Sequence, residues 1–159
     1  MLIYVALNLS INSIAAAMPH LPLLRKGLRV LVVDGTADCR DLLTMLFDSY
    51  KVETTTATCV SEAIERMQQT LPDFVISELF LPSEDGHALM DKVKAFETTY
   101  RVQIPAIALT VCVGVHERTR ALTAGFCRHL AKPLDIDKLL AMIVCRTGSV
   151  QAMAANTCL

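Results

Sequence analysis

Five short runs, each largely apolar or rich in β-branched residues, alternate with five amphipathic segments between residues 29 and 146. The run at 30–33 is fully apolar, which is typical of a strand that is buried on both faces. The segments between the runs repeat apolar residues at helical spacing. Strands that alternate with helices in this way form a parallel sheet covered by helices on both faces. We therefore expect an α/β fold with a five-stranded parallel sheet and five helices.

The boundaries of these elements follow from the same patterns. The strands are expected at 30–33, 52–56, 74–77, 104–109 and 127–131. The helices are expected around 42–47, 61–67, 89–96, 116–124 and 136–146. A strong turn signal occupies residues 82–86, and Gly125 is placed to end the fourth helix. These elements fill one domain, 29–146, which leaves an N-terminal extension at 1–28 and a C-terminal tail at 147–159.

The N-terminal extension is unusual because residues 1–24 contain no lysine, arginine, aspartate or glutamate. It lacks the positive start of a secretory signal, and its apolar stretch is short for a membrane span. Pro19 and Pro22 then interrupt any helix. Three interpretations stay open: a disordered extension, a weak membrane anchor, or a misassigned start with Met18 as the true first residue. We favour the first or the last and do not expect membrane association.

Composition excludes several classes of function. The formal net charge is −1, from 15 basic and 16 acidic side chains, and no basic run suggests nucleic-acid binding. Hydrophobic residues make up 53% of the chain, which is enough for a sizeable core. No C-x-x-C pair signals a zinc or thioredoxin-like site. We expect the cysteines to be reduced and buried, as in a cytosolic protein. They stand at positions 39, 59, 112, 127, 145 and 158.

Polar residues stand at the carboxyl ends of four predicted strands: Asp34, Glu78, Thr110 and Lys132. In open α/β sheets, ligands bind outside these strand ends. With the strand order 2-1-3-4-5, Asp34 and Glu78 would be neighbours, and Thr110 and Lys132 would approach from the side. Carboxylates suit a divalent cation, while a hydroxyl and an ammonium suit phosphate oxygens. The alternative is a polar network that only closes the top of the sheet.

The same residues carry a resemblance to the receiver domains of two-component response regulators. Residues 30–34 resemble the first strand and acidic pocket of that family. Residues 72–78, with 81–82 and 85–86, resemble its phosphoacceptor strand and loop. Residues 106–110 resemble its fourth strand, and residues 125–133 its fifth strand, lysine and cis-prolyl turn. The resemblance covers about residues 29–146 and implies a flavodoxin-like (CheY-like) doubly wound sheet of order 2-1-3-4-5.

Two positions depart from what this resemblance implies. In the family, an aspartate accepts a phosphoryl group from a histidine kinase, aided by Mg²⁺, two further acids, a hydroxyl and a lysine. Here Glu78 stands at the acceptor position, and Gly35 stands where the second acid normally lies. Losing one carboxylate weakens Mg²⁺ binding. The extra methylene of Glu moves its carboxylate by about 1.5 Å, a displacement to which in-line transfer is sensitive.

We therefore predict a pseudo-receiver: a stand-alone receiver that signals by protein contacts without being phosphorylated, and that is not an enzyme. Glu78 would pair with Lys132 directly and satisfy two partly buried charges without a metal. It would either mimic the phosphorylated state or lock an inactive-like one. We expect no cofactor, with at most weak Mg²⁺ binding at Asp34 and Glu78. The alternatives are a residual Mg²⁺-dependent phosphoacceptor and a small-molecule-binding pseudo-receiver.

The resemblance also implies a switch position and an output surface. His129 stands three residues before the lysine, where the family often carries an aromatic switch residue, although a half-exposed strand residue is the simpler interpretation. The output surface comprises the helix at 116–124, the fifth strand and the helix at 136–146, with His116, Arg120 and Lys138 among its polar residues. We expect a protein partner there, such as a histidine kinase or a downstream regulator, or a second copy in a homodimer. A bacterial, cytoplasmic location fits this role.

Overall fold

The computed structural model describes residues 24–111 and 114–147, which form five strands and five helices. The strands are β1 (Arg29–Val33), β2 (Glu53–Ala57), β3 (Phe74–Glu78), β4 (Ala106–Thr110) and β5 (Arg128–Ala131). The helices are α2 (Ala37–Ser49), α3 (Val60–Gln69), α4 (Gly86–Tyr100), α5 (Val115–Ala124) and α6 (Ile136–Thr147). Residues 1–23 of the N-terminal extension and 148–159 of the C-terminal tail fall outside the described residues, while Leu24 and Leu28, at the end of the extension, are buried in the core.

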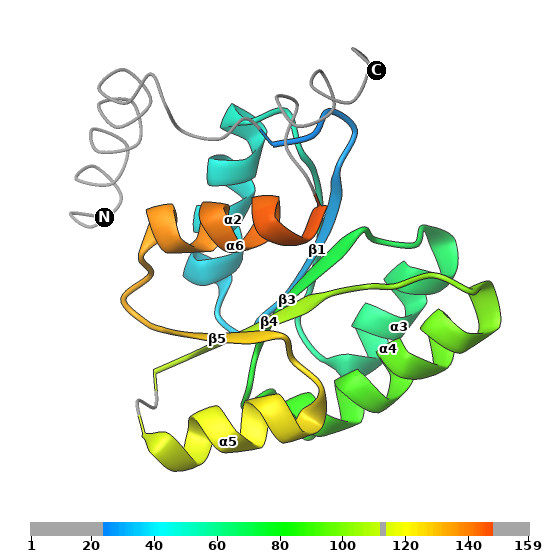
Figure 1. Cartoon of the computed structure of the whole chain (residues 1–159), viewed down its shortest axis with the longest axis vertical. Coiled ribbons are helices and arrows are strands. Elements are labelled where there is room, and N and C mark those ends of the chain that lie inside the picture. Colours follow the sequence, from blue (N-terminus) through cyan, green and yellow to red (C-terminus); the bar gives the residue numbers. More distant parts are fainter. Residues whose placement is uncertain (1–23, 112–113, 148–159) are drawn as a thin grey trace, which may run out of the picture.

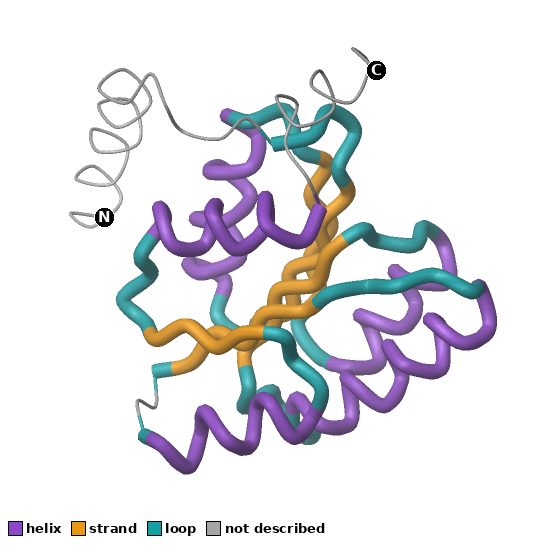
Figure 2. Tube along the Cα trace, viewed as in Figure 1, coloured by secondary structure: helices purple, strands orange, loops and turns teal. Residues whose placement is uncertain are grey.

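The five strands form one parallel sheet in the order β2-β1-β3-β4-β5, which confirms the predicted fold class (Figures 1 and 2). β1 pairs with β2 and with β3, so that Val33 lies opposite both Ala57 and Ser77. Thr110, at the end of β4, lies opposite Ala131 of β5. All strands therefore end at the same edge of the sheet, where the predicted polar cluster is expected.

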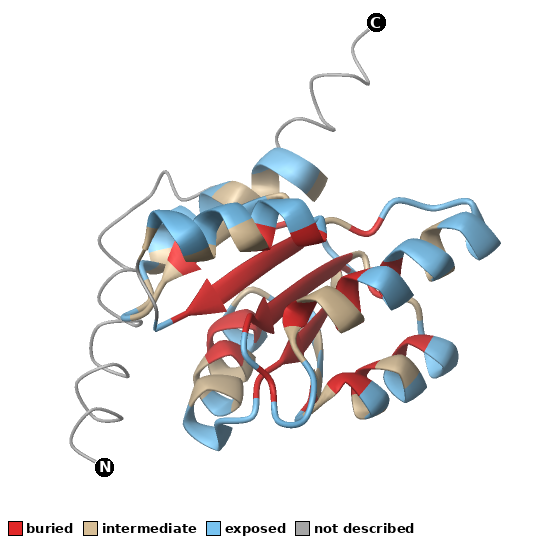
Figure 3. Ribbon diagram, turned by 90° about the horizontal axis from the view of Figure 1, so that it is seen from below, coloured by how far each residue is buried: buried red, intermediate tan, exposed pale blue. Residues whose placement is uncertain are grey.

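Helices cover both faces of the sheet, and each face has its own hydrophobic core. α2 and α6 pack on one face through residues such as Phe47 and Leu140. α3, α4 and α5 pack on the other through residues such as Met67 and Leu89. Figure 3 shows the strands buried between the two layers, with the outer sides of the helices exposed. Successive strand residues point to opposite faces, and therefore the two helix layers contact alternate residues of β1, β3 and β4.

The predicted strand boundaries differ from those in the structure by up to two residues, and two of the shifts have a clear cause. The second strand was expected from Val52, but the Val52 N–H donates to Phe47 O at 3.1 Å and so belongs to the exit of α2. The fourth strand was expected from residue 104, but β4 begins at Ala106. Pro105 has no N–H to donate to a ladder, although its carbonyl accepts from Val75 N at 3.0 Å.

The prediction of buried cysteines is wrong for the four that the structure describes. Cys39, Cys59 and Cys127 are half-buried and Cys145 is exposed, all four as free thiols. Cys59 caps α3, Cys127 precedes β5, and Cys145 lies on α6 away from the buried Ile143. Because their neighbours in the sequence are apolar, the sequence did not indicate that these cysteines lie at the ends of elements or on an exposed side of a helix. Cys112 and Cys158 lie outside the described residues.

No helix within residues 24–111 and 114–147 is long and apolar enough to cross a membrane. The stretch for which a weak anchor was considered, residues 1–18, lies outside those ranges.

Candidate functional site

The four predicted site residues lie at the carboxyl edge of the sheet and define what we call the acidic pocket: Asp34, Glu78, Thr110 and Lys132. Asp34 follows β1, Glu78 ends β3, Thr110 ends β4 and Lys132 follows β5. The first three are buried. Because β1 pairs with β3, the two carboxylates come from adjacent strands. The backbone N–H of Lys132 donates to Thr110 O at 2.9 Å, which fixes the fifth strand end beside the fourth.

Lys132 bridges the two carboxylates of the acidic pocket. Its Nζ donates to Asp34 Oδ2 at 2.7 Å and to Glu78 Oε2 at 2.8 Å. The Lys132 side chain is 19% exposed, against 3% for Asp34 and 11% for Glu78. Burial lowers the pKa of Lys132, but the hydrogen bonds to Asp34 and Glu78 outweigh it and raise that pKa above its ordinary value. The lysine therefore remains charged at neutral pH.

Asp34 is held at both of its carboxylate oxygens. Oδ2 accepts from Lys132, and Oδ1 accepts from the backbone N–H of Thr36 at 2.8 Å. Burial raises the pKa of Asp34, but the hydrogen bonds from Lys132 and Thr36 overcome this and hold that pKa below its usual 3.8. The Arg40 guanidinium also donates to the Asp34 carbonyl at 2.6 Å, which ties α2 to the end of β1.

Glu78 is likewise held at both oxygens. Oε2 accepts from Lys132, while Oε1 accepts from the backbone N–H groups of Leu79, at 2.8 Å, and Phe80, at 3.4 Å. The Ser77 hydroxyl donates to the Glu78 carbonyl at 2.9 Å. The longer side chain thus folds back over the loop that follows β3 and still reaches the lysine.

The donor set of the acidic pocket does not fit Mg²⁺. Magnesium needs near-octahedral oxygen coordination with carboxylates free to bind it, and both carboxylates here are engaged by N–H donors. Gly35 stands where the resemblance implies a second acid, and a Cβ there would meet the Pro82 ring carbons at 3.1 and 3.2 Å. Within the described part of the chain, no three His, Cys, Asp or Glu side chains are grouped to hold a metal.

Sequence reasoning missed several residues that complete this site, including Arg40, Ser77 and Pro82. It also missed the pocket role of Cys39, whose pKa is raised to about 12 by burial and by the hydrogen bond to Asp34. Cys39 and Arg40 lie in the first turn of α2, directly above the end of β1. Their position shortly after Asp34, at the start of a helix, could have indicated that they lie close to the acidic pocket. The approach of Pro82 to Gly35 leaves no trace in the sequence.

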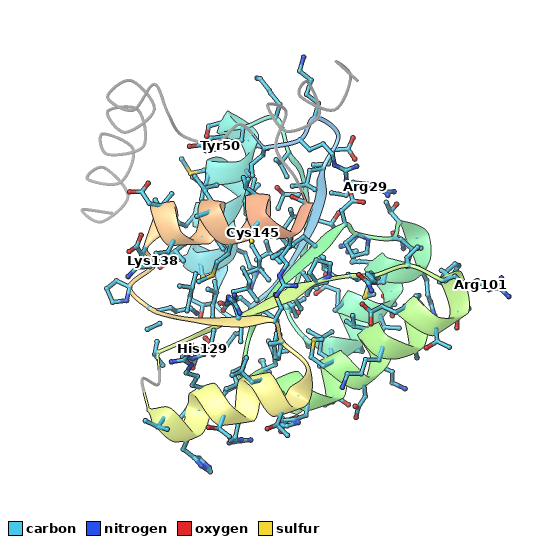
Figure 4. All side chains as sticks on the ribbon, viewed as in Figure 1. Arg29, Tyr50, Arg101, His129, Lys138 and Cys145 are labelled. Carbon is cyan, nitrogen blue, oxygen red and sulfur yellow. The ribbon has the colours of Figure 1, made fainter. Side chains whose placement is uncertain are left out.

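His129, the predicted switch residue, is half-buried on β5 on the side of α5 (Figure 4). Its Nε2 is buried and has no hydrogen-bond partner among the described residues. This agrees with a strand residue that is partly covered. Whether it reports a signalling state stays a prediction.

The three residues predicted for the output surface differ in what their side chains contact. His116 is exposed on α5. Arg120, also on α5, lies 3.5 Å from Asp85 and places its guanidinium 5.3 Å from the centre of the Phe80 ring. Lys138 of α6 pairs with Asp135 at 3.2 Å and is labelled in Figure 4. Of the three, only Arg120 contacts the loop that Glu78 holds.

Comparison with known proteins identifies the family that this chain resembles. The sequence profile of the response regulator receiver domain matches residues 30–144. An uncharacterized 14.6 kDa protein of Leptolyngbya boryana is 33% identical over 114 residues, 72% of this chain and 86% of that protein. The regulatory protein AtoC of Escherichia coli is 29% identical over 79% of this chain, which spans only 26% of AtoC.

Solved structures show the same fold. The receiver domain of the Saccharomyces cerevisiae response regulator Ssk1, crystallised with the histidine phosphotransfer protein Ypd1, matches with a TM-score of 0.71. The match covers 78% of this chain and 91% of that one at 19% identity. Such low identity shows the fold alone.

Proposed function

This chain belongs to the response regulator receiver domain family, and we propose that it is a pseudo-receiver, which signals through protein contacts without being phosphorylated. The observation that carries the proposal is the pair of hydrogen bonds that the Lys132 ammonium donates, one to Asp34 and one to Glu78. In the family, the corresponding lysine is needed for the transferred phosphoryl group. Here the ammonium already has two buried carboxylate partners, and displacing either would leave a buried charge unpaired.

The acceptor chemistry is also unfavourable at Glu78. Both of its oxygens accept hydrogen bonds, which makes the carboxylate a weaker nucleophile, and its extra methylene changes its position relative to Thr110 and Lys132. The poor fit of the pocket to Mg²⁺ removes the charge neutralisation on which phosphoryl transfer depends. Glu78 therefore acts as a fixed pocket charge and not as a phosphoacceptor.

A continuous set of contacts supports signalling from this pocket to α5. Glu78 Oε1 holds the N–H of Phe80, and the Phe80 ring lies beneath the Arg120 guanidinium. Arg120 also pairs with Asp85, whose carboxylate caps α4 by accepting from His87 N at 3.1 Å. The charge state of the acidic pocket can thus bias the position of the α5 surface.

We propose that the partner is a protein of a two-component system, such as a histidine kinase, a phosphotransfer protein or a downstream regulator. The co-crystal of Ypd1 with the Ssk1 receiver domain supports this class of partner, since a similar fold contacts a phosphotransfer protein there. The surface formed by α5, β5 and α6 is the proposed docking face, for a partner or for a second copy of this chain. The proposal places the protein in the bacterial cytoplasm and gives it no enzymatic activity.

Acetyl phosphate labelling tests the proposal. The full chain is incubated with acetyl phosphate and Mg²⁺, and intact-protein mass spectrometry follows the gain of a phosphoryl group. We expect no acid-stable, hydroxylamine-sensitive adduct on the natural protein. The matched variants are Glu78→Asp and Glu78→Gln. An acyl phosphate that forms on the natural protein and disappears in Glu78→Gln would overturn the proposal and support the residual phosphoacceptor.

A further inference from the structure

A second candidate site lies at the opposite edge of the sheet from Lys132. A cavity of about 690 Å³ opens at the amino ends of the strands, and we call it the basal cavity. Arg29 at the start of β1, Ala106 at the start of β4 and Cys127 before β5 line it, and Figure 4 shows Arg29 at that end. Its volume falls in the usual range for small-molecule sites.

The charge of the basal cavity is positive. Its charged lining residues are Arg25, Arg29, Asp73, Lys94, Glu97 and Arg146. Asp73 is shared between two arginines, with Arg25 at 3.4 Å and Arg29 Nε at 3.5 Å. The Glu97 carboxylate accepts from the backbone N–H of Ile104 at 2.7 Å. Four cations thus face two carboxylates that already have partners.

Several donors of the basal cavity have capacity for an anion. Arg25 Nε is buried and has no hydrogen-bond partner within the described residues. Lys94 and Arg146 form no ion pair with any residue that the structure describes. Unpaired cations beside a recess attract anions, and this attraction is strongest where the recess excludes water.

Gly125 helps to place one of these cations. It ends α5 with a φ of +113°, and a Cβ there would meet Lys94 Cε at 2.7 Å and Nζ at 3.0 Å. The stem of Lys94 therefore lies against the bare glycine backbone, with its ammonium beside the cavity wall. A larger residue at position 125 would push the lysine away as well as strain the turn.

Part of the remaining wall of the basal cavity is apolar, beside the polar side chains of Gln103 and Thr147. Leu71 and Met90 contribute from one side, and Val102, Ile104 and Pro105 from the segment before β4. A wall of this kind contacts a flat organic body, while the cations contact its charged group. Inorganic phosphate alone would leave most of this wall uncovered.

From this combination we propose that the basal cavity binds an organic phosphate of mononucleotide size, with its phosphate at Lys94 and Arg146 and its body on the apolar wall. The site is separate from the acidic pocket, so this proposal stands or falls independently of the function proposed above. A ligand here would touch α4, the turn after α5 and the end of α6 together.

A titration of AMP into the isotope-labelled full chain tests the site. The backbone amide signals of Val102, Gly125 and Cys127 report on the cavity walls. We expect saturable shifts with AMP, weaker binding of uncharged adenosine, and weaker binding of inorganic phosphate. Lys94→Gln and Arg146→Gln should each weaken AMP binding about fivefold through loss of a charge-assisted hydrogen bond. Lys92→Gln, an exposed neighbour on the same helix, is the matched control and should bind normally.

Each contrary outcome has a definite meaning. If AMP gives no saturable shifts, or if Lys94→Gln and Lys92→Gln bind it equally, the proposed site is overturned. Equal binding of adenosine and AMP would contradict the phosphate contact. Equal binding of inorganic phosphate and AMP would contradict the role of the apolar wall.

Discussion

The Lys132 ammonium nitrogen lies 2.8 Å from Glu78 Oε2, and both side chains are largely buried. The same nitrogen lies 2.7 Å from Asp34 Oδ2. A receiver-type lysine is therefore paired twice by carboxylates of its own chain.

Glu78→Gln should destabilise the fold, because Lys132 would keep only one carboxylate partner. We expect a loss of about 1–2 kcal/mol in the free energy of unfolding at neutral pH, below the cost of fully unpairing a buried charge. Urea unfolding followed by circular dichroism measures it. Glu84→Gln, an exposed position in the loop after β3, is the control and should change stability by less than about 0.5 kcal/mol. Equal effects of the two variants would contradict a stabilising role for the Glu78–Lys132 pair.

Asp34 should give the protein an acid-sensitive stability. Its folded pKa lies below the ordinary 3.8, so its contribution is complete above that value and is lost as the pH falls through the folded pKa. Between about pH 5 and about pH 2, Asp34→Asn should lose less stability than the natural protein. Asp48→Asn, an exposed carboxylate on α2, serves as the control. Parallel acid curves for the natural protein and Asp34→Asn would show that Asp34 is not held in this way.

Cys39 and Cys59 should react with thiol reagents at very different rates. Burial and the neighbouring Asp34 raise the pKa of Cys39 to about 12, which leaves almost no thiolate at neutral pH. The hydrogen bond from Ser61 lowers the pKa of Cys59. Peptide mass spectrometry after brief iodoacetamide treatment should find Cys59 modified well before Cys39, and Ser61→Ala should slow Cys59 specifically. Faster reaction at Cys39 would refute the hydrogen-bonded pocket around Asp34.

Arg120 should transmit the state of the acidic pocket to α5. In the natural background, Glu78→Gln should shift the backbone amide signals of Glu117, Ala121 and Leu122 in the α5 helix. In an Arg120→Gln background, the same change should shift them less, because the contacts to Phe80 and Asp85 are gone. Arg118→Gln, an exposed arginine on the same helix, is the matched control background. Shifts of the same size in both arginine backgrounds would exclude this route.

Much of the fold was predictable from the sequence because local and long-range signals agree. β1, β3 and β4 are buried on both faces and carry continuous apolar runs, and each strand ends at or next to a polar residue. The order of the parallel sheet followed from the resemblance and from the rules for crossover connections. The strand boundaries differ from the expected ones by up to two residues, and at the starts of β2 and β4 the exit of α2 and Pro105 account for the difference.

The residues of the acidic pocket could be predicted from the sequence, but only some of the contacts between them could. Pairing of Glu78 with Lys132 was expected from the extra methylene, and the structure places the two in contact. The other hydrogen bond of Lys132, to Asp34, depends on the path of the chain after β5, which the sequence pattern does not specify. The position of Pro82 over Gly35 depends on the turn after β3 and was likewise beyond a one-dimensional pattern.

Beryllofluoride titration tests the central claim most directly, that Glu78 and Asp34 keep Lys132 from handling a phosphoryl group. Mg²⁺ with beryllofluoride is added to the isotope-labelled natural protein and to the Gly35→Asp/Glu78→Asp variant, in which the Pro82 ring must shift slightly to admit the new side chain. Backbone amide signals of Leu79, Thr110 and Lys132 are followed. We expect no saturable response from the natural protein and a Mg²⁺-dependent response from the variant. A saturable response of the natural protein at these residues would contradict the account.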